Sequence, residues 1–160
     1  MLKYLYCKEV FSEVPDEISL ALSISNCQLK CEGCNQPELW KNVGKTLSCD
    51  VLDELISKHR GITCVCFMGS GNNEYDSLNE LAAHVRKRGY KTAVYLGEDT
   101  IPTALDINVF NYIKIGHWDA SKGGLSSRTT NQKMYLIEPF GNEVHYVHLI
   151  TYKFWNKDEN

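Results

Sequence analysis

The sequence has no hydrophobic run long enough for a membrane-spanning helix, and its first residues do not resemble a signal peptide. Positive charge is not in excess either, because the formal net charge is −3, which argues against binding to a nucleic-acid backbone. Low-complexity segments, linkers and internal repeats are also missing. We therefore expect a cytoplasmic, single-domain protein (1–160) that has neither a membrane nor a nucleic acid as its partner.

Seven cysteines in a chain expected to stay in the cytosol favour metal or redox chemistry over disulfide bonds. Three of them, Cys27, Cys31 and Cys34, form the pattern Cys-x3-Cys-x2-Cys. The pattern lacks a fourth cysteine, whereas structural zinc sites and simple electron-transfer clusters normally use four protein ligands. Three ligands on a 4Fe–4S cluster leave one iron open for a substrate or cofactor. The spacing therefore predicts a 4Fe–4S cluster with an open iron.

Strands and helices alternate along the chain. The predicted strands are 18–24, 63–68, 92–96, 112–115, 134–137 and 144–150, and the predicted helices are 48–60, 76–88 and a shorter one within 99–110. This alternation implies right-handed crossovers and a mainly parallel α/β sheet, flat or partly closed into a barrel. Ligands of such sheets bind at the carboxyl ends of the strands. The cysteines and a glycine-rich turn at 69–73 both lie at such ends.

Residues 31–40, Cys-Glu-Gly-Cys-Asn-Gln-Pro-Glu-Leu-Trp, resemble the cluster loop of the enzymes that activate anaerobic ribonucleotide reductase, within the radical S-adenosylmethionine (SAM) superfamily. Residues 65–69, 112–116 and 129–132 are similar to other segments of that family, so the resemblance extends over about residues 18–138. It implies a small partial (β/α) barrel of the radical SAM type.

The resemblance also implies an activity. The family consists of oxidoreductases that bind one 4Fe–4S cluster and reductively cleave S-adenosylmethionine. The resulting 5′-deoxyadenosyl radical generates a glycyl radical on the large subunit of the anaerobic (class III) ribonucleotide reductase. A low-potential electron donor such as flavodoxin is the second implied partner.

Individual residues match functional positions of the family. Cys27, Cys31 and Cys34 match the cluster ligands. The positions that match cofactor contacts are Gly69, Ser70, Gly71, Asn72, Tyr95, Gly97, Lys114 and Asn131. The turn at 69–72 corresponds to the one that receives the methionine amino group, although the family usually has two adjacent glycines and an acidic residue there. Lys114 corresponds to a lysine near the methionine carboxylate.

Alternative interpretations remain open. The three cysteines could form a zinc site completed by His117 or Cys66, or belong to a non-catalytic iron–sulfur module. Radical chemistry could instead serve another glycyl-radical enzyme or a small metabolite. Lys114 could be a surface lysine, and Asn131 could be a turn residue.

Several other features have structural interpretations. Cys64 and Cys66 alternate on an apolar strand, so we expect both to be buried. The basic residues at 84–88 are expected to end a helix, where cations complement the helix dipole. The loop at 116–128 is a candidate docking surface for the reductase.

Overall fold

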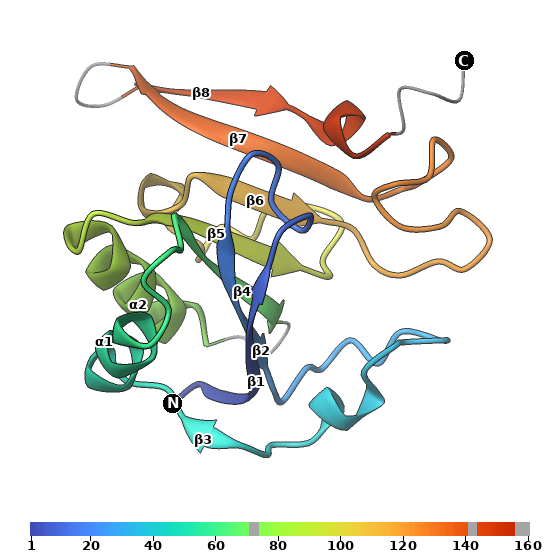
Figure 1. The fold of residues 1–160 in the computed structure, drawn as a ribbon. Helices are drawn as coiled ribbons and strands as arrows, with labels where there is room; N and C mark the ends of the chain where they lie inside the picture. Colours follow the sequence, from blue (N-terminus) through green and yellow to red (C-terminus); the bar gives the residue numbers. More distant parts are fainter. Residues whose placement is uncertain (71–73, 141–143, 156–160) are drawn as a thin grey trace.

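The computed structural model describes residues 1–70, 74–140 and 144–155, which are organised around one mixed eight-stranded β-sheet (Figure 1). The strands lie side by side in the order β3-β1-β2-β4-β5-β6-β7-β8. Their bounds are β1 Lys3–Val10, β2 Ser19–Ile24, β3 Lys45–Thr46, β4 Cys64–Ser70, β5 Lys91–Leu96, β6 Tyr112–Ile115, β7 Lys133–Phe140 and β8 Val144–Leu149. The helices are α1 Cys49–Ser57, α2 Tyr75–Lys87 and the 3-10 helices η1 Pro37–Trp40, η2 Ile107–Val109 and η3 Thr151–Phe154.

The prediction of a mainly parallel sheet curled into a partial (β/α) barrel is wrong. Strands β2, β4, β5 and β6 are joined by three parallel pairings, but the other four pairings of the sheet are antiparallel. The described residues also contain only two α-helices. The connections between the strands explain why the sheet is mixed. A strand that runs parallel to the strand before it needs a long crossover connection, usually a helix. Residues 116–132, all of them described, contain no helix, and the chain returns as β7 antiparallel to β6.

The parallel centre of the sheet and the two α-helices lie where the sequence predicts them. Helix α1 is capped by Ser48, whose side chain accepts a hydrogen bond from the backbone N–H of Val51 at 3.2 Å. The basic end of α2 contacts α1, since His84 and Arg88 lie 2.9 and 3.0 Å from the carboxylate of Asp53. The prediction that basic residues end this helix is confirmed, because they occupy the last turn and the C-cap of α2, and two of them also join the two helices.

The prediction of a short helix within residues 99–110 is confirmed only in part. Helix η2 occupies three residues of this segment. Asp106 caps it by accepting a hydrogen bond from the backbone N–H of Asn108 at 3.0 Å. Neither α1 nor α2, nor any other helix in the described ranges, combines the length and apolar character that crossing a bilayer requires.

Side chains are buried on both faces of the sheet. Helices α1 and α2 pack on one face (Figure 1), over a core that includes Phe67 and Val94. A smaller buried cluster contains Cys64 and Cys66. Burial raises the pKa of the Cys64 thiol to about 12 and also raises the pKa of Cys66. Both cysteines are therefore buried and protonated at neutral pH, and the prediction that they are buried is confirmed.

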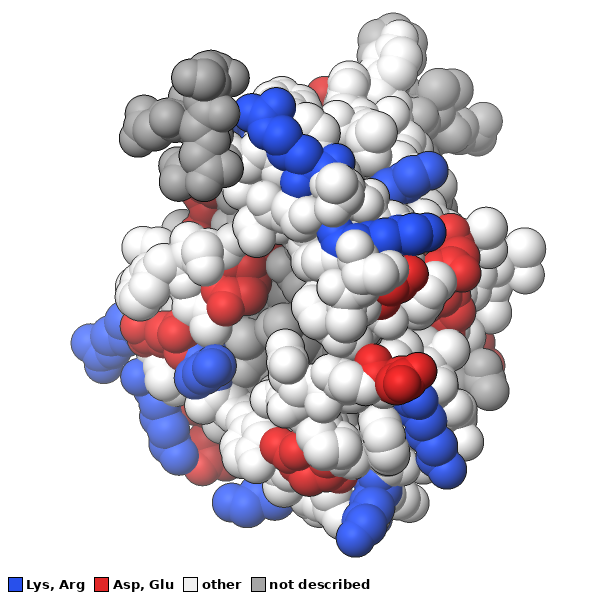
Figure 2. Space-filling view, turned by 90° about the vertical axis from the view of Figure 1, so that its right-hand side faces the viewer, with Lys and Arg blue, Asp and Glu red and all other residues white. Residues whose placement is uncertain are grey.

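Two loops protrude on one side of the molecule, at the right of Figure 1. The cysteine loop (residues 25–36) follows β2, and the β6–β7 loop (residues 116–132) follows β6. Figure 2 shows this side face on, with a hollow bordered by both acidic and basic side chains. The carboxyl ends of two parallel strands thus carry the two loops between which a site can form.

Candidate functional site

The cysteine loop presents three free thiols just beyond the end of β2. Cys27, Cys31 and Cys34 are all partly exposed, and none is in a disulfide. The backbone N–H of Cys27 donates to the carbonyl oxygen of Leu39 at 2.9 Å, and that of Cys34 donates to Cys31 at 3.2 Å. The first bond attaches the start of the loop to η1, and the second closes a turn between two of the cysteines.

A cavity of about 250 Å³ lies between the cysteine loop and the sheet. Cys27 and Cys34 line it on the loop side, and Gly69, Tyr95 and Lys114 line it from β4, β5 and β6. Its remaining lining residues are Asn35, Gln36, Leu39, Trp40 and Trp118. The fold therefore brings five of the predicted site residues to one cavity.

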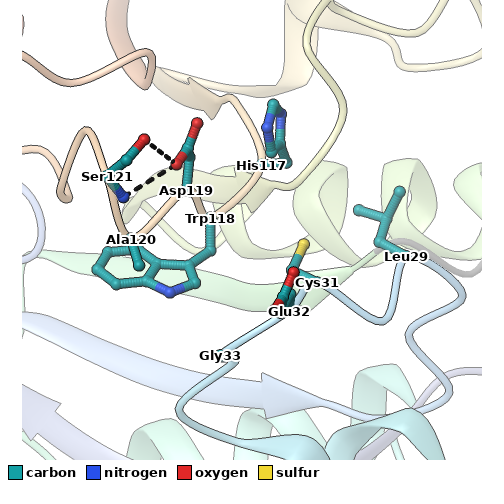
Figure 3. Close-up of a pocket in the computed structure, with 9 residues that line it drawn as sticks. All are labelled: Leu29, Cys31, Glu32, Gly33, His117, Trp118, Asp119, Ala120 and Ser121. Atoms are coloured by element: carbon teal, nitrogen blue, oxygen red, sulfur yellow. Dashed lines mark hydrogen bonds between the residues drawn. The ribbon is translucent and has the colours of Figure 1, made fainter.

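Cys31 lines a neighbouring cavity of about 670 Å³ (Figure 3). One wall comes from residues 29–33 of the cysteine loop, and the other comes from residues 117–121 of the β6–β7 loop. In Figure 3 the Cys31 sulfur points from the first wall toward the second. Trp118 lines both cavities, so one side chain contributes to the walls of each.

The described residues contain no group of three or more His, Cys, Asp and Glu side chains arranged to hold a metal ion. The three cysteines thus share one loop without being drawn together into a closed ligand set. The chemistry of the donors does fit an iron–sulfur cluster, because three free thiols on one short loop can be deprotonated to bind iron. Within the same described ranges, neither His117 nor Cys66 joins them as the fourth ligand of a zinc site.

Lys114 is buried, with 7% of its surface exposed, so its interpretation as a surface lysine is wrong. Its Nζ donates to the carbonyl oxygens of Gly116 at 2.8 Å and Leu96 at 3.3 Å, and it lies 5.7 Å from the centre of the Tyr95 ring. Burial lowers the pKa of Lys114 to about 8, while negative charge at Cys31 opposes that shift. Both of these acceptors are backbone carbonyl oxygens, so a carboxylate ligand in the cavity could still pair with the ammonium of Lys114.

Gly69 lines the same cavity at a point where only glycine fits. Its φ angle is +88°, and a Cβ built there would lie 2.8 Å from the carbonyl oxygen of Ile24. The missing side chain lets the end of β4 approach the end of β2. Of the other predicted turn residues, Ser70 is the last residue of β4, and the structure describes its backbone only. Gly71 and Asn72 lie outside the described residues.

Tyr95 and Gly97 have different roles at the end of β5. The Tyr95 ring lines the smaller cavity, its hydroxyl donates to the carbonyl oxygen of Glu13, and burial raises its pKa. Gly97 instead contacts the cysteine loop, because a Cβ at this position would overlap Cδ1 of Leu29. Gly97 therefore provides room for the loop, whereas Tyr95 contributes to the cavity wall.

Asn131 is not brought to either of these cavities. Its Nδ2 donates to the carbonyl oxygen of His117 at 3.1 Å, so it holds the β6–β7 loop together. Its Oδ1 is buried and has no hydrogen-bond partner among the described residues. The geometry favours the structural interpretation of Asn131 over a direct cofactor contact.

Two groups at the site were not selected from the sequence. Trp40 lines the smaller cavity, and its indole Nε1 is buried without a partner in the part of the chain that the structure describes. Asp99 lies 2.7 Å from Nδ1 of His117, which lines the larger cavity, and this hydrogen bond holds the pKa of Asp99 below its usual range. The sequence signal for Trp40 was its position near the cysteines, but nothing in the sequence around Asp99 indicated a role for it.

Comparison with known proteins does not assign the chain to a family. No family model matches it, and neither a curated protein nor a solved structure matches it. The residues of the site and their geometry must therefore support any functional conclusion.

Proposed function

We propose that the protein is an iron–sulfur enzyme that uses S-adenosylmethionine to generate a glycyl radical on an anaerobic ribonucleotide reductase. The observation that carries this proposal is the cavity that joins Cys27 and Cys34 to Gly69 and to the buried ammonium of Lys114. The cavity offers thiols that can bind iron. It also offers a stretch of backbone that no side chain covers and an ammonium group, which suit the amino and carboxylate groups of an amino acid. The proposal does not require a barrel, because the parallel pairings of β2, β4, β5 and β6 already place their carboxyl ends together.

The thiols and the glycine are suited to two parts of such a site. When bound, a 4Fe–4S cluster and S-adenosylmethionine supply one-electron cleavage of a carbon–sulfur bond, giving methionine and a 5′-deoxyadenosyl radical that can take a hydrogen atom from glycine. Cys27, Cys31 and Cys34 would hold the cluster as thiolates and leave one iron without a protein ligand. The backbone at Gly69 can approach an amino group closely because no side chain intervenes.

Lys114 is suited to bind the carboxylate of the methionine moiety. Its ammonium has three donors, of which two are used by the carbonyl oxygens of Leu96 and Gly116. The third is available for an anionic ligand. A bound carboxylate would also stabilise the protonated form of Lys114 against the cost of burial.

The larger cavity is suited to admit a segment of the reductase. It lies beside Cys31, and small residues, Gly33, Ala120 and Ser121, contribute to its lining (Figure 3). An extended glycine-containing segment needs such a space, because its backbone must come close to the reacting group. In this proposal the protein acts in the cytoplasm, with a low-potential donor such as flavodoxin supplying the electron.

Electron paramagnetic resonance under anaerobic conditions tests the proposal. The sample combines reconstituted protein, dithionite, S-adenosylmethionine and the anaerobic reductase from the same source. We expect the doublet of a glycyl radical, which should be absent without S-adenosylmethionine and in the Cys31→Ala variant.

The other outcomes discriminate between the alternatives. Production of 5′-deoxyadenosine without a glycyl radical on the reductase would indicate another glycyl-radical enzyme or a small metabolite as the target. Zinc without acid-labile sulfide would refute the cluster. An intact cluster that never yields 5′-deoxyadenosine would indicate a non-catalytic iron–sulfur module.

A further inference from the structure

Trp40 combines two properties at the smaller cavity. Its side chain lines this cavity together with Cys27 and Cys34, yet its indole Nε1 is buried and has no hydrogen-bond partner among the described residues. A buried N–H without an acceptor costs free energy, and such groups are uncommon in folded proteins. An unpaired donor in the wall of a binding cavity therefore points to an acceptor that becomes available when the cavity binds its ligand.

The backbone holds Trp40 directly beside the first cysteine of the loop. The N–H of Asn26 donates to the carbonyl oxygen of Lys41 at 2.9 Å, and the N–H of Cys27 donates to the carbonyl oxygen of Leu39 at 2.9 Å. Trp40 lies between these two acceptors in the chain, so it is placed opposite the peptide that joins Asn26 to Cys27. Both hydrogen bonds are made by the main chain, and a substitution of the Trp40 side chain leaves their donors and acceptors in place.

The burial of the indole nitrogen limits which atoms can accept its hydrogen. Because water does not reach this nitrogen, a solute in the cavity does not reach it either, so the acceptor belongs to the cavity wall. The amides of Asn35 and Gln36 line the wall, but their oxygens have the same acceptor strength with or without a ligand and leave Nε1 unpaired. The sulfurs of Cys27 and Cys34 differ, because a thiol is a weak acceptor and an iron-bound thiolate is a charged one. Of these two cysteines, Cys27 is bonded to the segment that carries the indole.

We propose that the indole N–H of Trp40 donates a hydrogen bond to the sulfur of Cys27 when that sulfur is a thiolate bound to the cluster. This inference rests on the cluster of the proposed function, but it requires neither S-adenosylmethionine nor the reductase. Trp40 is then a positioning residue, because it acts on the cluster through one of its ligands. Hydrogen bonds to the sulfurs help to set the reduction potential of a cluster. A donor stabilises the reduced state more than the oxidised one, because the reduced state carries more negative charge, and its loss should therefore make the cluster harder to reduce.

Trp155 provides a matched control for Trp40. Its Nε1 is also buried without a partner among the described residues, but Trp155 follows η3 and lines neither of the two candidate cavities. The centre of its ring lies 5.3 Å from the guanidinium carbon of Arg128. Trp40→Phe and Trp155→Phe each keep an aromatic ring and remove one buried indole N–H. Only the first of these two variants removes it from the wall of the smaller cavity.

Two measurements on the anaerobically reconstituted protein test the proposal. The first is a redox titration followed by electron paramagnetic resonance of the reduced cluster. We expect Trp40→Phe to lower the ratio of reduced to oxidised cluster at a fixed potential by about threefold or more, and Trp155→Phe to leave it unchanged. Iron and sulfide assays check that each variant is loaded, and circular dichroism checks that each is folded.

The second measurement detects the hydrogen bond itself. The chain has three tryptophans, so the double variant Trp118→Phe, Trp155→Phe retains Trp40 alone. With nitrogen-15 in its indole, pulsed electron paramagnetic resonance should show a hyperfine coupling between this nitrogen and the reduced cluster. A change in the access of water to the cluster would not produce such a coupling, and the measurement does not depend on whether Trp40→Phe can be loaded.

The outcomes separate this inference from the proposed function. A loaded cluster without a nitrogen coupling from Trp40 would overturn the inference and leave the proposed function intact. Equal potentials for the unmodified protein and Trp40→Phe would do the same, and so would an equal shift in Trp40→Phe and Trp155→Phe. A protein that binds neither iron nor sulfide would refute the cluster of the proposed function, and this inference with it.

Discussion

The Cα of Gly69 lies so close to Ile24 that a Cβ on Gly69 would be 2.8 Å from the Ile24 carbonyl oxygen. This contact joins the end of β4 to the end of β2, from which the cysteine loop departs. Gly69 also has a φ angle of +88°, which side chains rarely tolerate. The wall of the smaller cavity therefore depends on glycine both for space and for backbone conformation.

Replacing this glycine is expected to destabilise the fold. Gly69→Ala should lower the free energy of unfolding by about 1–3 kcal/mol, because it adds backbone strain and a clash with a carbonyl oxygen. Urea denaturation of the cluster-free protein measures the change. Gly61→Ala is the matched control, since no described atom other than those of its chain neighbours lies within 4 Å of a Cβ there, and it should change stability by less than about 0.5 kcal/mol. Equal stabilities for the two variants would contradict the close approach at Gly69.

Cluster loading should depend on the three loop cysteines and on no other partly exposed cysteine. Each of Cys27→Ala, Cys31→Ala and Cys34→Ala is expected to lose nearly all iron and acid-labile sulfide after anaerobic reconstitution. Iron and sulfide assays per chain measure this loss.

The controls for cluster loading are Cys7→Ala and Cys49→Ala, which should retain the cluster. Burial raises the pKa of both thiols, which disfavours the thiolate that binds iron. If any one loop variant keeps a full cluster, that cysteine is not a ligand.

The buried ammonium of Lys114 should make stability depend on alkaline pH. Its folded-state pKa of about 8 lies below the ordinary value of 10.5, so the unfolded chain binds more protons between these values. The free energy of unfolding contributed by Lys114 therefore rises with pH across this window, by up to about 3 kcal/mol, and is constant well below it.

The comparison with Lys114→Met isolates this effect. Both proteins contain the thiols and tyrosines that titrate in the same pH range, so the contributions of these groups cancel in the difference between the two free energies of unfolding. We expect the stability of the unmodified protein minus that of Lys114→Met to increase from pH 8 to pH 10.5, measured by urea denaturation without the cluster. The exposed Lys58→Met is the control for loss of one lysine. A difference that stays constant with pH would show that Lys114 is solvated.

A buried carboxylate away from the candidate site offers a test of the fold alone. Glu17 is 7% exposed and accepts hydrogen bonds from Thr63 at 2.6 Å, Lys91 at 2.7 Å and Tyr112 at 3.2 Å. Lys91→Met should lower the free energy of unfolding by about 1–3 kcal/mol, because the carboxylate loses its charged partner. Thermal or urea denaturation measures the loss, and Lys58→Met again serves as the control. An unchanged stability would indicate that Glu17 is not held as described.

The central elements could be predicted because their signals are local. The apolar run that includes Cys64 and Phe67 identifies β4, and Ser48 identifies the start of α1 through a hydrogen bond three residues away. The direction of β7 has no such signal, because it depends on whether a helix crosses back over the sheet. The mainly parallel sheet was predicted from alternation and the partial (β/α) barrel from the family resemblance, and a loop without a helix overturned both.

The candidate site shows the same division between local and distant determinants. The spacing of Cys27, Cys31 and Cys34 could be recognised from adjacent residues alone. The burial of Lys114 could not be predicted from adjacent residues, since it depends on residues that are distant in sequence. Asn131 also matched a functional position, yet in the fold it donates to the carbonyl oxygen of His117 and lies away from the cavities.

The sequence by itself determined the central strands, the two α-helices and the three thiols on one loop, because each depends on residues within a few positions of one another. For the described residues, the tertiary structure alone decided that four strand pairings are antiparallel, that Lys114 faces a cavity with Cys27 and Cys34, and that β8 lies at one edge of the sheet. These features depend on how strands distant in sequence pair and on which loop covers which strand end. Those contacts form only when the whole sheet is assembled, and so no local pattern encodes them.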